Sequence, residues 1–243
     1  MKIVLLSAGL LLSNYQVDAQ TVAANDSSLL NPAVRAAQQR YRAGAPESRL
    51  LNGVAYATNA PSYVRGHPFF QSSDPQPGTL RYDGQSFADV ELLYEQVLDQ
   101  VLLYGPAQAG PMQLIRQKVQ EFELAGHRFV RLPADSAGVL TEGFYDLVVD
   151  GPAQFLVRRT KKLEAATGGY DLKGGYEEKT AFFVQRQGRF YEVSSLRQTL
   201  GALADKKPEM QAYARRSRLG FAVDSRETSI AELVKQYNVL AKK

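Results

Sequence analysis

The sequence contains no cysteine and only two histidines among 243 residues, His67 and His127. Without cysteine, the chain has no disulfide, no lipid anchor on a thiol, no thiolate metal ligand and no thiol nucleophile. A zinc site takes three or four ligands from Cys, His and carboxylates, so two histidines 60 residues apart could form one only by recruiting Asp or Glu. We expect no metal, no other cofactor, and a fold held together by packing alone.

The sequence also lacks the short patterns that are typical of common enzymes. There is no G-x-S-x-G turn, and neither histidine lies in a pattern that indicates a catalytic base. The glycines of TGGYDLKGGYEEK, residues 167–179, do not follow the order of a phosphate-binding loop. We interpret that stretch as a flexible excursion between strands, and we expect a protein without enzymatic activity.

Long apolar runs are missing after the first residues. Residues 3–12 are apolar, follow Lys2, and lead to Val17 and Ala19 at the third and first positions before a cut. This pattern predicts a signal peptide that is cleaved after Ala19. The run is too short to cross a bilayer, and no later stretch of the required length is free of charges. We predict an exported protein without a transmembrane span, located in the periplasm or on the outer cell surface.

The charge of the chain is unevenly distributed. Residues 157–243 carry 18 Lys and Arg against 10 Asp and Glu, a net of +8, whereas residues 1–156 carry 11 against 15, a net of −4. Export makes nucleic acid an unexpected target, so the basic half points to an anionic envelope surface or to an envelope protein with an acidic surface. The alternative is that basic helices simply face water. The sequence leaves the oligomeric state open.

The main body of the chain is dominated by hairpin signals. Asp83-Gly84 and Asp150-Gly151 each stand between apolar stretches, and Asp-Gly tolerates the positive φ angles of a two-residue turn. Two further hairpins are predicted in FELAGHRFV and FFVQRQGRFYEV. Their uneven spacing argues against a repeat fold. We predict a meandering antiparallel sheet, curled into an open barrel or a sandwich.

One segment of the body, residues 89–104, allows two interpretations. Its apolar residues recur at helical spacing, which predicts a helix when the segment is taken alone. It follows directly on a hairpin strand, however, and is rich in Val, Leu and Tyr. We therefore favour two strands, residues 89–94 and 100–104, that turn around Leu98-Asp99.

Helices are predicted at both ends of the mature chain. In a polar segment, residues 20–48, Asn31 and Pro32 begin a short helix. Residues 49–193 form the antiparallel β body, and residues 194–243 form a basic tail of three helices. The fold class is therefore mainly β with a helical C-terminus.

The helices of the tail are predicted from their start signals and from one apolar stripe. The start signals are Ser194 or Ser195, then Asp205 with Pro208, then Asp224 with Glu227 as a capping box. The stripe, on the third helix, consists of Ile230, Leu233, Val234, Tyr237 and Leu240. Because such a stripe must be covered, we expect it to pack on the sheet or on the sister helices. The alternative is a helix that binds a partner.

Several stretches of the chain together resemble a group of uncharacterised, exported proteins of Gram-negative envelopes. They include GHPFF, PGTLRYDGQSFADVELLYEQVLDQV, GFYDLVVDG and GRFYEVSSLRQTLGALADKKPEMQAYARR, and with others they cover about residues 31–240. The resemblance implies a β-rich body with a helical C-terminus, and it supports two strands in residues 89–104. It implies no activity and no site residues.

His67 lies in VRGHPFF, between two residues that shape the backbone. Gly66 permits a bend, and Pro68 pushes the residue before it toward extended geometry. We expect His67 to be a structural residue in a bend that delivers Phe69 and Phe70 into the core.

His127 and the carboxylates are the remaining candidates for catalysis. His127 follows a predicted hairpin tip, where a solvent-facing ring is ordinary. Acids are scattered through the β body, among them Asp83, Asp89, Glu91, Glu95, Asp146 and Asp150. A carboxylate pair for glycoside hydrolysis is one interpretation. Two of these acids are turn residues, however, and we interpret the rest as a solvated sheet face.

The predicted binding residues are basic. They are Arg158, Arg159, Lys161 and Lys162 in VRRTKKLE, and Arg215 and Arg216 in the tail. Alternation directs Arg158 and Lys162 to one face of a strand and Arg159 and Lys161 to the other. They would bind an anionic group, such as a lipid headgroup or a phosphorylated glycan. The alternative is that they protect an exposed sheet edge from pairing.

Two hypotheses of function remain. The first is a non-catalytic envelope protein, a binding or structural module that contacts a protein partner, a membrane surface or a surface polymer. The second is an envelope hydrolase that uses carboxylates, with or without a histidine. An enzyme needs a concave pocket where a histidine or two acids converge, whereas a binding module does not.

Overall fold

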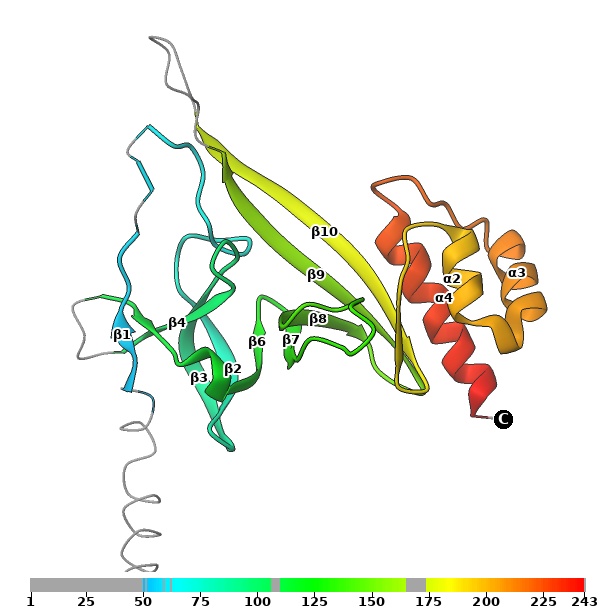
Figure 1. Ribbon diagram of the computed structural model, residues 1–243, viewed down its shortest axis with the longest axis horizontal. Helices are drawn as coiled ribbons and strands as arrows, with labels where there is room; N and C mark the ends of the chain where they lie inside the picture. Colours follow the sequence, from blue (N-terminus) through cyan, green and yellow to red (C-terminus); the bar gives the residue numbers. More distant parts are fainter. Residues whose placement is uncertain are drawn as a thin grey trace, which may run out of the picture. The chain divides into compact units, whose positions relative to one another are not determined.

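Figure 1 shows the computed structural model of the chain. The predicted signal peptide and the predicted N-terminal helix lie outside the residues that the structure describes. All described residues belong to one unit, Glu47–Lys243. They are residues 50, 52–58, 60–61, 63–105, 110–164 and 174–242.

The described strands form one antiparallel sheet. They are β1 (Val54–Ala55), β2 (Gln76–Tyr82), β3 (Gln85–Glu95), β4 (Gln100–Tyr104), β5 (Met112–Gln113), β6 (Val119–Leu124), β7 (His127–Leu132), β8 (Gly143–Val149), β9 (Ala153–Glu164), β10 (Gly175–Arg186) and β11 (Arg189–Glu192). Their order is β1-β5-β4-β3-β2-β6-β7-β8-β9-β10-β11, so the sheet is open with β1 and β11 at its edges. The predicted meandering antiparallel sheet is confirmed.

Three hairpins have the same two-residue turn. Their turn residues all have positive φ angles: Asp83 (51°) and Gly84 (77°), Ala125 (52°) and Gly126 (78°), Gln187 (52°) and Gly188 (76°). Positive φ at both positions matches the right-handed twist of the flanking strands. The fourth predicted hairpin forms between β8 and β9, but the prediction of a two-residue turn there was wrong. Pro152 has no N–H to donate to a ladder, so the connection extends to three residues, 150–152.

The ambiguous segment forms two strands, as predicted. β3 ends at Glu95, β4 begins at Gln100, and the two pair in register. Helical spacing is misleading here because the end of β3 is covered on both faces. Leu92, Leu93 and Tyr94 are all fully buried, and a strand buried on both sides has no polar alternation.

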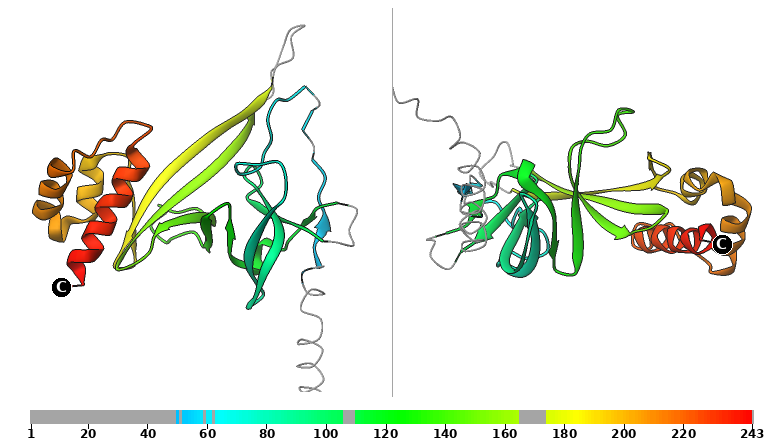
Figure 2. Two further views of the ribbon diagram at one scale, coloured as in Figure 1. Left: turned by 180° about the vertical axis from the view of Figure 1, so that it is seen from behind. Right: turned by 90° about the horizontal axis from the view of Figure 1, so that it is seen from below.

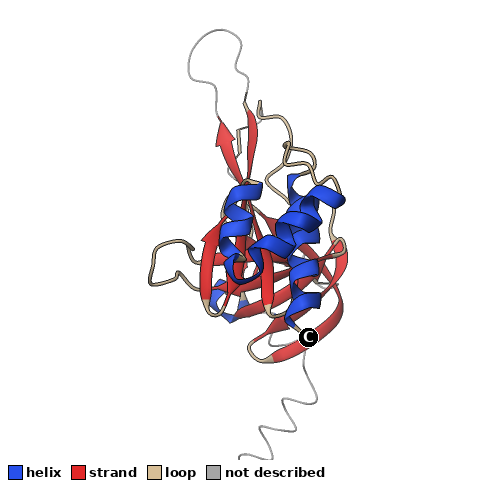
Figure 3. Ribbon diagram, turned by 90° about the vertical axis from the view of Figure 1, so that its right-hand side faces the viewer, coloured by secondary structure: helices blue, strands red, loops and turns tan. Residues whose placement is uncertain are grey.

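Three α-helices follow the sheet: α2 (Leu196–Ala202), α3 (Lys207–Arg216) and α4 (Arg226–Ala241). Short 3₁₀ turns occur at η2 (Arg116–Lys118) and η3 (Ala204–Lys206). Figure 2 shows the helices gathered together beside β9 and β10, and Figure 3 shows the helices grouped on one side of the strands. None of the described helices is long and apolar enough to cross a membrane.

The apolar stripe of α4 packs on the sheet, as expected. Ile230, Leu233, Val234 and Tyr237 are buried in one cluster with Val149, Phe155 and Val157 of the sheet and Leu200 and Met210 of the other helices, and Leu240 packs against it half-buried. The side chain of Asn238 donates to the carbonyl of Ala153 and accepts from its N–H, both at 2.8 Å. The helix is therefore part of the core.

The start signals of the helices had different outcomes. Ser195 caps α2 by accepting the Gln198 N–H, and Pro208 lies in the first turn of α3, as predicted. The predicted capping box of α4 was wrong. The helix begins after Ser225, without a side-chain cap, because Glu227 is bound to an arginine of the sheet instead.

A second cluster lies in the half of the sheet that contains β2 to β8. Its centre is made of Tyr94, Phe122, Phe129 and Phe144, whose contacting ring centroids are 4.8–5.9 Å apart. Edge-to-face and offset contacts of this kind stabilise aromatic cores. β8 contributes to this cluster and to the one under the helices, so the acids and bases on β8 and β9 are held in fixed positions.

Candidate functional site

The basic run on β9 is divided between the two faces of the sheet. Arg158 and Arg159 are adjacent, so their side chains point to opposite faces. Arg158 contacts Asp99, whereas Arg159 contacts Asp146 and Glu227. The predicted alternation within this run is confirmed for these two residues.

Arg159 joins the sheet to the last helix. Its Nε and one terminal nitrogen donate to Asp146 Oδ2 on β8, at 3.1 and 2.9 Å. Its two terminal nitrogens also donate to both carboxylate oxygens of Glu227 on α4, at 3.1 and 2.6 Å. Burial lowers the pKa of the Arg159 guanidinium, but the bonds to Glu227 and Asp146 outweigh burial, and the pKa is raised. The charged guanidinium therefore clamps β8, β9 and α4 together.

His127 extends this network toward solvent. Its Nδ1 lies 2.7 Å from Asp146 Oδ2, and its Nε2 lies 3.3 Å from the amide nitrogen of Gln71. Because a carboxylate can only accept, Nδ1 donates to it, and in the neutral ring Nε2 then accepts from Gln71. The Phe70 ring meets the imidazole edge-on, with centroids 5.1 Å apart. The His127 ring is partly exposed, but the buried carboxylate of the neighbouring strand holds it, and the sequence did not predict that contact.

A cavity of about 400 Å³ opens beside this network. Its charged lining residues are Arg159, Glu178, Lys179 and Glu227, and its uncharged ones are Phe70, Gln71, Gln96, His127 and Thr160. The volume lies within the range of about 300–1,000 Å³ that is usual for small-molecule sites. We call it the His127 cavity.

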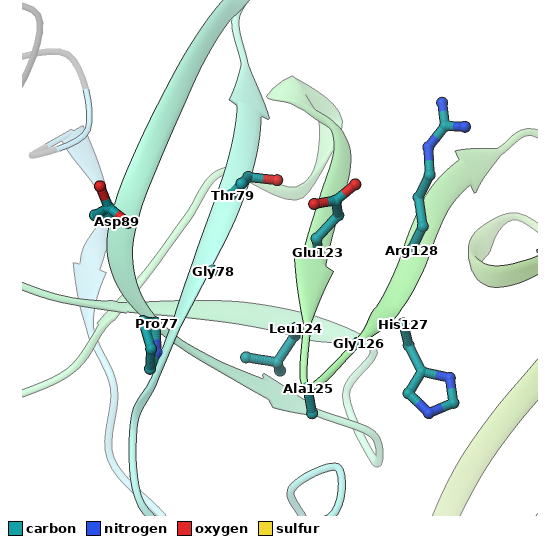
Figure 4. Close-up of a pocket in the computed structure, with 10 residues that line it drawn as sticks. All are labelled: Pro77, Gly78, Thr79, Asp89, Glu123, Leu124, Ala125, Gly126, His127 and Arg128. Atoms are coloured by element: carbon teal, nitrogen blue, oxygen red, sulfur yellow. The ribbon is translucent and has the colours of Figure 1, made fainter.

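A second hollow, of about 440 Å³, shares His127 with the first. In Figure 4, the side chains of Thr79, Glu123 and Arg128 point to one side of the strands, and the His127 ring points to the other. Its two acids, Asp89 and Glu123, are exposed. This hollow therefore has no buried charge network, and the His127 cavity is the better candidate site.

On the opposite face of β9, Arg158 belongs to a closed network. Asp99 accepts from the Tyr94 hydroxyl at 2.6 Å and from the Phe144 N–H at 3.3 Å, and it lies 3.3 Å from an Arg158 nitrogen. A Cβ at Gly143 would overlap both Arg158 and Asp99, so a larger residue there would displace this network. Burial, together with the negative charge of Asp99, raises the pKa of Tyr94 well above its usual value. The hydroxyl therefore remains protonated and donates.

Glu95, at the end of β3, is a third buried acid. Its carboxylate accepts from the N–H groups of Val97 and Leu98, at 3.1 and 2.8 Å. Burial raises the pKa of Glu95, although these two hydrogen bonds act to lower it. Its role is to hold the turn between β3 and β4.

The six basic residues predicted as a binding site do not come together. The four on β9 are each paired: Arg158 with Asp99, Arg159 with Asp146 and Glu227, Lys161 with Glu178, and Lys162 with Glu164. Lys161 also donates to the carbonyls of His67 and Phe69, at 3.3 and 2.8 Å. Arg215 and Arg216 lie apart from these, in the last turn of α3. Anion binding by the β9 residues stays a prediction.

His67 lies in a bend, as predicted, next to Gly66 with a φ of 84°. Its ring stacks on Phe69, with centroids 6.0 Å apart. Phe70 is buried whereas Phe69 is half-buried, so the bend delivers one of the two aromatic rings into the core. The carbonyl of His67 accepts a hydrogen bond from Lys161, and this bond ties the bend to β9.

The interpretation of the acids as a solvated face was wrong for two of them. Asp146 and Glu95 are both only 1% exposed. Asp146 stands between Tyr145 and Leu147 in the apolar strand FYDLVV. That position is the signal that could have revealed it, because a charge in a buried strand must be paired. Asp83, by contrast, is a turn residue, as predicted.

No three histidine or acidic side chains of the described ranges are placed to hold a metal ion together. Compared with protein-family models, with curated proteins and with solved structures, the chain has no match. The resemblance to exported envelope proteins therefore stays a prediction, and the function has to be argued from the His127 cavity.

Proposed function

We propose that the protein is an exported, non-catalytic envelope protein that binds an uncharged polar ligand, a saccharide unit of a surface polymer, in the His127 cavity. The observation that carries this proposal is that the charges of the cavity are already paired. Two cations and two anions line it, Arg159, Lys179, Glu178 and Glu227, so their formal charges cancel.

Each charged lining residue has a partner of its own. Arg159 is bound to Asp146 and Glu227, Glu178 lies 3.0 Å from Lys161 Nζ, and Lys179 lies 3.8 Å from Glu177. A charged ligand at Arg159 would have to break its pairs with Asp146 and Glu227, and breaking a buried pair is costly. This favours a ligand without net charge.

The uncharged lining residues suit hydroxyl groups. Gln71, Gln96 and Thr160 each offer both a donor and an acceptor, and a sugar hydroxyl also donates and accepts. Phe70 and His127 add two aromatic rings to the lining. The described lining is therefore mostly polar, with Phe70 as its one apolar side chain, which suits a hydroxylated ligand.

The test is calorimetric titration of residues 20–243 with neutral hexasaccharides (cellohexaose, maltohexaose, N-acetylchitohexaose) and with acidic hexagalacturonate. We expect a neutral probe to bind more tightly than the acidic one. The double variant Gln71→Leu and Thr160→Val should weaken binding at least about fivefold, since each lost hydrogen bond is worth about 1 kcal/mol. Gln211→Leu with Thr228→Val makes the same changes at exposed positions on the helices and should bind like wild type. Equal affinity of the two double variants, or no binding of any neutral probe, would contradict the proposal.

One observation favours a second function, the envelope hydrolase. The contact between His127 Nδ1 and Asp146 is the kind by which an acid orients a catalytic histidine, and its Nε2 lies 3.3 Å from the amide nitrogen of Gln71, another lining residue of the cavity. In such an enzyme His127 would act as a general base on a water molecule.

Hydrolysis is tested with the same probes. The hydrolase requires wild-type protein to release products from a hexasaccharide that it binds, and His127→Gln to abolish the release while keeping the affinity within about threefold. Binding without product release supports the non-catalytic proposal.

A further inference from the structure

We propose that the corner between α3 and α4 docks on an anionic lipid bilayer. This corner, the Arg corner, consists of Arg215, Arg216 and Arg218 at the end of α3, and of Val223 in the connection to α4. The inference goes beyond saccharide binding and does not depend on it, because it concerns a different surface.

The three arginines are exposed and free of acid partners in the described part of the chain. Unlike Arg158 and Arg159, none of them forms an ion pair with a described acid. The last turn of α3 holds no acid that would neutralise them. Arg216 lies over the ring of Tyr213, with its guanidinium carbon 5.7 Å from the ring centroid. A stacked guanidinium still presents its N–H groups to an anion.

Arg218 occupies a backbone position that usually belongs to glycine. It follows the C-cap of α3 with a φ of 52°, and the next N–H, that of Leu219, closes the helix on the carbonyl of Ala214 at 3.0 Å. Any side chain at such a position strains the backbone. The turn thus fixes Arg218 in an exposed position just after Arg215 and Arg216.

Val223 adds an apolar contact to the charges. It is 79% exposed, the most exposed large hydrophobic residue in the described chain. The connection that carries it is anchored on both sides, because Leu219 and Phe221 pack on the core and Gly220 accepts from the Ser229 hydroxyl at 2.6 Å. Val223 is therefore held outward.

Three exposed basic residues within four positions, followed five residues later by an exposed apolar side chain, fit the interface of an anionic bilayer, where headgroups meet the charges and the apolar group enters between them. Asp224, beside Val223, is the one acid of the connection, so the Arg corner with Asp224 carries a net charge of +2. Each basic residue near an anionic surface strengthens partitioning about fivefold. Three of them together should contribute on the order of 100-fold.

The experiment is co-sedimentation of residues 20–243 with vesicles of phosphatidylcholine, alone or mixed with phosphatidylglycerol. The test variant is Arg215→Gln, Arg216→Gln and Arg218→Gly, in which the glycine relieves the strained turn and protects the fold. The matched control is Lys207→Gln, Lys235→Gln and Lys242→Gln, which removes the same charge from other exposed positions of the helices. Val223→Ser tests the apolar contact.

We expect wild type to bind the phosphatidylglycerol vesicles only, the arginine variant to lose on the order of 100-fold in binding, and the lysine variant to lose much less. Val223→Ser should weaken binding without changing its salt dependence. The proposal is overturned if wild type does not bind the anionic vesicles, which is the result expected for a protein whose partner is an acidic protein. It is also overturned if the two triple variants lose binding equally. Hexasaccharide titration of the arginine variant keeps the two proposals apart, because its cavity is unaltered.

Discussion

Two neighbouring arginines on β9 serve two different surfaces. Arg158 meets Asp99 in a network that is closed by the Tyr94 hydroxyl and by the backbone at Phe144. Arg159 meets Asp146 in a network that borders a cavity of about 400 Å³. Both arginines are bound to a buried carboxylate.

The difference between the two faces lies in the space beside the ion pair. At Gly143, the closed network leaves no room even for a Cβ. At the His127 cavity, the pair is flanked by amide and hydroxyl groups that have room for a ligand. The paired charges are therefore expected to stabilise the fold on both faces of β9. Only the face of Arg159 has a cavity beside the pair, and that cavity is the reason to expect binding there.

The largest effect is expected at Asp146. Asp146→Ala leaves Arg159 and His127 without their shared acceptor and should lower the free energy of unfolding by about 3–5 kcal/mol, as for other broken buried pairs. Urea unfolding measures it. Glu178→Ala is the control, since the pair of its exposed carboxylate with Lys161 should be worth about 0–1 kcal/mol. Equal losses would mean that the network at Arg159 is no stronger than a surface pair.

Removing the charge of Asp99 tests the closed face. Asp99→Asn keeps an acceptor and tolerates the positive φ of 55° at this position, but it loses the charged hydrogen bonds from Tyr94 and Arg158. We expect a loss of about 1.5–3 kcal/mol in unfolding free energy. Hexasaccharide affinity should stay unchanged, and a weakened affinity would contradict the contrast between the two faces.

A smaller effect is expected at Glu227, whose side chain is one-third exposed. Glu227→Gln removes the charge that ties α4 to Arg159, and it should cost about 1 kcal/mol and speed amide hydrogen exchange in the first turn of α4. Glu232→Gln, on the same helix, serves as the control. If both variants exchange alike, the clamp between sheet and helix is not formed in solution.

The smallest effect depends on pH and concerns Glu95. Burial raises its pKa in the folded protein above the ordinary value of 4.5, so the folded state holds this proton more tightly than the unfolded state. The stability gained from the protonated carboxyl is full below the ordinary pKa and is lost as the pH rises through the raised one. The unfolding free energy of wild type minus that of Glu95→Gln should therefore fall as the pH rises from about 4. A constant difference, measured by urea unfolding at several pH values, would refute the raised pKa.

Much of the fold could be predicted because it follows local rules. Asp83-Gly84 specifies a turn through the φ angles of two adjacent residues, and the strands on either side follow from their composition. The stripe on α4 has the spacing of one helix face, and its burial needed no knowledge of the partner.

The candidate site could not be predicted because its contacts join distant parts of the chain. His127 and Asp146 are 19 residues apart, and Arg159 and Glu227 are 68 apart. The local pattern at Asp224 and Glu227 even predicts a different role, a capping box. The backbone N–H groups at the start of α4 compete poorly with the buried guanidinium of Arg159 for the carboxylate of Glu227.

The attachment of Asn238 to Ala153 has a consequence for the order in which the protein folds. The two residues are 85 positions apart, and the cluster under the helices is incomplete without Tyr237. During synthesis on the ribosome, the apolar side of β9 therefore stays exposed until α4 has been synthesised. Until then, the nascent chain exposes an apolar surface of the kind that chaperones bind.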